Sequence, residues 1–106
     1  VDTIPTSAGQ EDHVSMDAHG ARRLAQMAEN TTNVVAIELL AAAQGIEFHR
    51  PLKSSALLEH LIGQLRTEIP AYDRDRFFAP DIARAAQTIR DGRYRRALVP
   101  LLNILA

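Results

Sequence analysis

Proline is missing from a long stretch of this chain, Val14 to Gln44, and small or apolar side chains recur through it every three or four residues. The recurring positions are Val14, Ala18, Ala21, Ala25, Ala28, Thr32, Val35, Leu39 and Ala42. This spacing predicts one helix about 45 Å long, and Gly45 is placed to end it in a left-handed conformation. Because alanine allows close helix packing and the rest of the chain is too short to cover such a helix, we expect further partners.

Two shorter helices are predicted after it. The first takes Ser54 or Ser55 as its N-cap and continues to about Glu68, since Pro70 cannot extend it. The second has Pro80 in its first turn and ends at Gly92. Its predicted inward face consists of Ile82, Ala85, Ala86 and Ile89.

The two ends of the chain complete the predicted fold. Residues 1–13 are rich in Thr, Ser, Pro and Gly, which predicts a loop. The apolar tail at 98–105 is either a short helix or an extended strap. No segment alternates as a strand does. We therefore expect an all-α fold with an N-terminal loop (1–13) and a single-domain helical segment (14–106) of one long and two or three shorter helices.

The amino-acid composition excludes several classes of site and partner. The absence of Cys excludes disulfides, thiolate metal sites and a cysteine nucleophile. A net charge of -1 gives no strong field, so neither nucleic acid nor a membrane is an expected partner. No signal peptide or membrane-spanning segment is recognisable, and we expect a cytoplasmic location.

Reactive side chains are densest just before the long helix, in the segment 10–13. Unpaired N–H groups at a helix N-terminus suit carboxylates and anions. Asp12 and Ser15 are typical capping residues. Glu11 does not fit a capping box, because it lies four rather than three residues after Ser7. Glu11 is therefore a candidate functional carboxylate.

Other polar and aromatic patterns have structural explanations. His13 and His19 are six residues apart, a spacing that does not place two ligands on one helical face, so we expect no metal site. Arginines and aspartates interleave near the C-terminus, which predicts a solvated, ion-paired face. Tyr72, Phe77 and Phe78 are expected to anchor a loop to the helices.

Five ordered motifs resemble one enzyme family. They are Ser7–Met16 (SAGQEDHVSM), Met27–Thr31 (MAENT), Ala36–Gly45 (AIELLAAAQG), Leu52–Ser55 (LKSS) and Tyr72–Ile82 (YDRDRFFAPDI). Over most of residues 5–90 the chain resembles the C-terminal part of the histidine ammonia-lyases, aromatic amino acid lyases with a methylideneimidazolone prosthetic group. Gly9 departs from the family pattern, where Asn is frequent; this affects loop conformation more than chemistry.

The resemblance implies elimination of ammonia from L-histidine to give trans-urocanate. It also implies that the prosthetic group forms from an Ala-Ser-Gly tripeptide, which this sequence lacks. Ser7-Ala8-Gly9 has these residue types in another order. We therefore expect the prosthetic group in a missing N-terminal part, no cofactor in this chain, and no activity of the fragment alone.

Glu11 is the position that the resemblance places in the active site, where related phenylalanine lyases carry Gln. A carboxylate accepts hydrogen bonds from an imidazole or stabilises its positive charge, whereas a phenyl ring would leave it unpaired. Glu11 is thus a candidate for binding the substrate ring and for proton transfer, and both roles stay open. Gln10 is a weaker substrate-binding candidate, which either orients Glu11 or only bonds within the loop.

The resemblance further implies a homotetramer with the long helix in a central bundle, so the rest of the lyase and identical subunits are expected partners. One alternative is an ammonia-lyase or aminomutase acting on another aromatic amino acid, because residues outside this chain also set specificity. A second is a non-catalytic helical assembly module. Apolar stripes from Leu24 to Leu40 and from Leu57 to Leu65 are expected to be exposed, which predicts that the isolated chain associates or partly unfolds.

Overall fold

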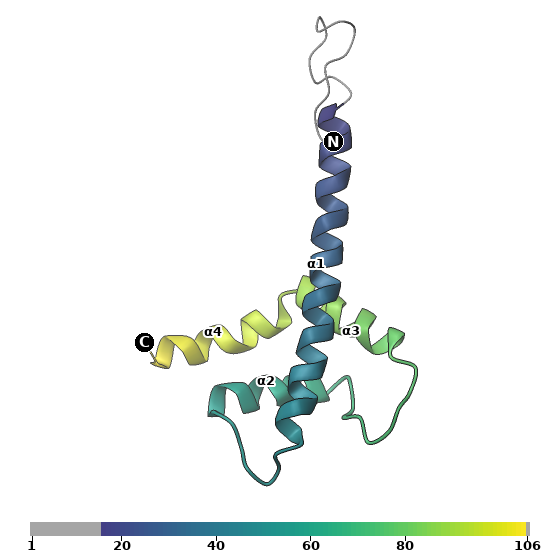
Figure 1. Ribbon diagram of the computed structural model, residues 1–106. Coiled ribbons are helices and arrows are strands. Elements are labelled where there is room, and N and C mark those ends of the chain that lie inside the picture. Colours follow the sequence, from purple (N-terminus) through teal and green to yellow (C-terminus); the bar gives the residue numbers. More distant parts are fainter. Residues whose placement is uncertain (1–15, 106) are drawn as a thin grey trace, which may run out of the picture. The chain divides into compact units, whose positions relative to one another are not determined.

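The computed structural model of the chain describes residues 16–105, and the side chains from 18 to 102. It contains four helices: α1 (Met16–Glu47), α2 (Ala56–Arg66), α3 (Ala79–Arg90) and α4 (Arg93–Leu105) (Figure 1). No strand occurs in this part of the chain, so the predicted all-α fold is confirmed there. The predicted loop at residues 1–13 lies outside it.

The chain divides into two units, Val1–Thr31 and Thr32–Ala106, and the boundary falls inside α1. In the described part of the first unit, every side chain from 21 to 31 is exposed. Leu24 and Met27 are 67% and 54% exposed. This part of α1 therefore presents apolar surface to its surroundings.

Gly45 lies within α1, so the prediction that it ends this helix in a left-handed conformation is wrong. The residues after it gain contacts by remaining helical. Ile46 packs against the hydrophobic core. Glu47 accepts a hydrogen bond from Nε of Arg66 at 2.7 Å. These contacts outweigh the cost of glycine in a helix, about 1 kcal/mol relative to alanine.

The N-cap of α2 is Ser55, one of the two predicted serines, whose Oγ accepts a hydrogen bond from the N–H of Leu58 at 3.2 Å. The helix ends at Arg66, two residues earlier than predicted. Beyond it, the N–H groups of Glu68 and Ile69 both donate to the carbonyl of Leu65. These hydrogen bonds form a turn after the end of the regular helix.

The start and end of α3 are those predicted from Pro80 and Gly92. Pro80 lies in the first turn of α3, and Gly92 follows the helix with φ 70°. The glycine relieves the steric strain of this left-handed conformation. Since α4 begins at the next residue, the tail is a helix rather than a strap, with Pro100 inside it.

The core of the second unit is small and joins α1, α2 and α3. Its buried residues are Ala36, Leu40, Ala43, Ile62, Leu65, Ile69, Ala85 and Ala86. Half of them are alanines, which let the helices pack closely. The predicted inward face of α3 is confirmed, because Ile82 and Ile89 pack against this core. The expectation of two exposed apolar stripes is wrong at Leu40 in the first stripe and at Ile62 and Leu65 in the second, because these side chains are buried.

Candidate functional site

Glu11 and Gln10, the two residues predicted to act on a substrate, lie outside the described part of the chain, as do Asp12 and His13. The first helix begins five positions after Glu11, at Met16. The roles of Glu11 and Gln10 therefore stay predictions. What the structure does describe is a groove on the second unit and the polar contacts that shape it.

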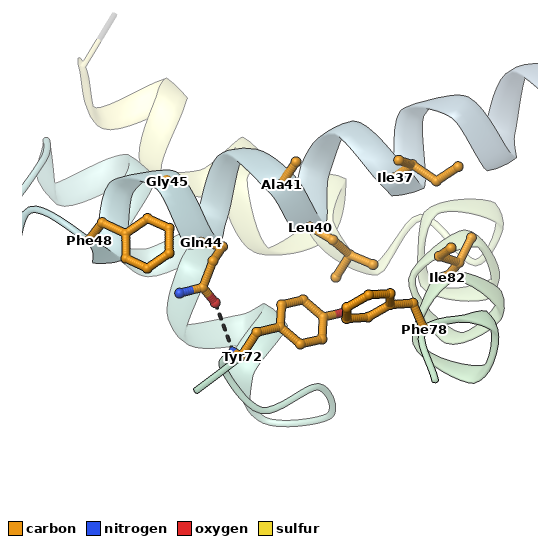
Figure 2. A pocket seen from close by; sticks show the side chains of 9 residues that line it. All are labelled: Ile37, Leu40, Ala41, Gln44, Gly45, Phe48, Tyr72, Phe78 and Ile82. Carbon is orange, nitrogen blue, oxygen red and sulfur yellow. Dashed lines mark hydrogen bonds between the residues drawn. The ribbon is translucent and has the colours of Figure 1, made fainter. Parts of the chain in front are cut away.

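The groove, which we call the α1 groove, has a volume of about 350 Å³ (Figure 2). It is lined by Ile37, Leu40, Ala41, Gln44, Gly45 and Phe48 on the α1 side, and by Tyr72, Phe78 and Ile82 on the other. Apart from the amide of Gln44 and the hydroxyl of Tyr72, these side chains are apolar. The α1 groove thus suits apolar groups, and its lining contains no carboxylate or imidazole.

Tyr72 fixes the loop before α3 against α1. Its backbone N–H donates to Oε1 of Gln44 at 2.8 Å, the bond drawn in Figure 2. Its ring meets that of Phe78 edge-on, with ring centres 4.9 Å apart. An edge-to-face pair of this kind adds about 0.5–1.5 kcal/mol beyond the burial of its surface. The wall of the α1 groove is therefore held by both a polar and an aromatic contact.

Next to Tyr72, the carboxylate of Asp81 accepts two hydrogen bonds. The hydroxyl of Tyr72 donates to its Oδ2 at 3.1 Å, and Nε of Arg76 donates to the same oxygen at 2.9 Å. The guanidinium of Arg76 also lies 4.1 Å from the centre of the Tyr72 ring and donates to the carbonyl of Pro70. These groups satisfy one another, which favours a structural role.

The electrostatics agree with this role. Burial, followed by the hydrogen bond to Asp81, raises the pKa of Tyr72 above its ordinary value. The hydrogen bond to Asp81 likewise raises the pKa of Arg76. Both shifts keep each side chain in its protonated form near neutral pH, so neither is prepared to act as a base.

A second polar cluster closes the turn between α1 and α2. Arg50 donates to both carboxylate oxygens of Glu59, at 2.8 and 2.7 Å, and the N–H of Ser54 donates to Oε1 of the same residue at 2.9 Å. The hydrogen bond from Arg50 is the largest cause of a lowered pKa at Glu59. This carboxylate is therefore engaged in holding the turn.

The remaining sequence predictions have mixed outcomes. Tyr72 and Phe78 anchor the loop as predicted, whereas Phe77 is 80% exposed and does not, so that prediction is wrong for it. Part of the basic segment is ion-paired, through Arg76 with Asp81 and through Arg93 with Glu68. The roles of Gln44 and Glu68 were not predicted, because each side chain bonds to a partner more than 20 residues away in the sequence.

The described residues form neither a metal centre nor a membrane span. Across the described residues, no three side chains of His, Cys, Asp or Glu come together as a metal could require. Within the same part of the chain, none of the helices has the length and apolar character needed to cross a membrane.

Comparison with known proteins identifies relatives. The chain is 57% identical over 100 residues to a histidine ammonia-lyase of Photobacterium profundum, covering 94% of this chain and 19% of that protein. It is 56% identical over 101 residues to one of Rhodospirillum rubrum, covering 95% and 20%. A crystal structure of histidine ammonia-lyase from Trypanosoma cruzi matches with a TM-score of 0.81 and 38% identity, over 93% of this chain and 20% of the other.

The chain spans about a fifth of the length of these relatives. A family described as aromatic amino acid lyase matches residues 1–67, which include Gln10, Glu11 and the whole of α1 and α2. Since this match covers more than half of the sequence, the chain belongs to the aromatic amino acid lyase family.

Proposed function

We propose that this chain is part of a histidine ammonia-lyase, an enzyme that eliminates ammonia from L-histidine to give trans-urocanate. The 57% identity over 100 residues with the histidine ammonia-lyase of Photobacterium profundum carries the proposal. The carboxylate of Glu11 supports it, since an imidazole substrate provides the donors and the positive charge that such a group binds.

Enzymes of this family use a methylideneimidazolone group, which supplies an electrophile for the amino acid substrate. The 106 residues contain no Ala-Ser-Gly tripeptide from which to form it. Ser7-Ala8-Gly9 does not substitute, because the order of its residues differs. The group therefore belongs to the part of the lyase outside this chain, and the isolated chain is inactive.

In this proposal residues 1–13 form an active-site loop, and residues 14–106 form a helical segment that supports it. Glu11 accepts a hydrogen bond from the substrate imidazole, or takes up and returns a proton during elimination. Gln10 orients Glu11 or contacts the substrate.

The proposed partners are the rest of the lyase chain and identical subunits of a cytoplasmic homotetramer, in which α1 enters a central bundle. Exposed apolar side chains on α1 support this assembly. In the first unit they are Leu24 and Met27; in the second, Val34 and Ile37 are 61% and 50% exposed. Such a surface is typical of a helix that packs against other helices.

The test uses the complete lyase that contains this chain, with urocanate formation from L-histidine followed by absorbance. Glu11→Gln should lower turnover about 100- to 10,000-fold, the usual contribution of a positioned acid or base. Asp75→Asn is the matched control, because it makes the same chemical change at an exposed loop position. It should retain activity and assemble like the parent.

The kinetic pattern separates the two roles of Glu11. A raised KM with unchanged kcat indicates binding of the ring, whereas a lower kcat with the loss of one limb of the pH profile indicates proton transfer. An assembled Glu11→Gln enzyme with both kcat and KM unchanged would overturn the assignment. Faster turnover of phenylalanine or tyrosine than of histidine by the parent enzyme would favour the alternative of another aromatic substrate.

A further inference from the structure

We draw no further inference here: the strongest candidate, the apolar α1 groove between α1 and the loop that leads into α3, is an unpartnered face on a chain that spans a fifth of its relatives, and nothing in the structure shows what covers it.

Discussion

The backbone N–H of Tyr72 depends on a single side chain, the amide of Gln44. Gln44→Met keeps the length of the side chain but removes the acceptor. Leaving a partly buried donor unpaired costs about 1–3 kcal/mol. We therefore expect the Tyr72 amide hydrogen to exchange with solvent about 5- to 100-fold faster, as measured by hydrogen exchange in the complete lyase.

Gln64→Met is the matched control for this measurement. Gln64 lies on α2 and is not among the residues that line the α1 groove. Exchange at Tyr72 should keep its parental rate in this variant. Equal rates in both variants would show that Gln44 does not hold the loop.

The ion pair at Glu59 predicts a pH dependence. Because Arg50 lowers the pKa of Glu59 in the folded chain, its stabilising contribution is complete above the ordinary pKa of 4.5 and is lost as the pH falls below it. Glu59→Gln should therefore be less stable than the parent at pH 7, and the difference should shrink below pH 4.5. Urea unfolding between pH 7 and pH 4 measures the difference in unfolding free energy between the two proteins. Glu38→Gln, at an exposed position of α1, is the control.

A constant difference between parent and Glu59→Gln at every pH would contradict the role of the ionised carboxylate. The same would follow if the control variant reproduced the pH dependence of Glu59→Gln. Either result would mean that the substitution acts through something other than the Arg50 pair.

At the scale of the helices, two glycines that were both predicted to end a helix differ in conformation. Gly45 is helical and a Cβ built on it meets no atom within 4 Å, whereas Gly92 has φ 70°. Gly45→Ala should therefore stabilise the chain by about 0.5–1 kcal/mol, and Gly92→Ala should destabilise it by about 1–2 kcal/mol. Urea unfolding of the parent and both variants at one fixed protein concentration, followed by circular dichroism, measures both changes, because association makes stability depend on concentration. A loss of stability in Gly45→Ala would contradict its helical conformation.

Local sequence predicts a helix end correctly when the signal for it lies in neighbouring residues. Ser55, Pro80 and Gly92 were predicted correctly because a cap or a first-turn proline is encoded within about four residues. The end of α1 was not, since Ile46 and Glu47 remain helical through contacts with residues far along the sequence.

In the candidate site, too, sequence motifs were predictive, whereas contacts between distant residues were not predicted. Five ordered motifs, one of which contains Gln10 and Glu11, were enough to suggest a family, and the match over residues 1–67 supports that family. The wall of the α1 groove depends on the contact between Gln44 and Tyr72, which are 28 residues apart. Periodicity carries no information on such a pair, because many other pairings satisfy the same pattern.

At the scale of the whole molecule, the described part of the chain exposes more large apolar side chains than it buries. Among the described residues, large buried apolar side chains are few, namely Leu40, Ile62, Leu65 and Ile69. Leu24, Val34, Phe48, Leu52 and Phe77 are each more than 60% exposed. A small core with this much uncovered surface is expected of a segment that folds within a larger assembly.

The isolated chain should therefore associate with itself, and a charge on the exposed face of α1 should weaken that association. Val34→Glu places an ion where apolar contact is expected, which costs several kcal/mol if the position becomes buried. Sedimentation velocity at micromolar concentrations should show a smaller species than the parent. Arg22→Glu, also exposed on α1, is the control and should sediment like the parent. A parent chain that is a folded monomer at all these concentrations would contradict this prediction, because its exposed apolar side chains would then need no partner.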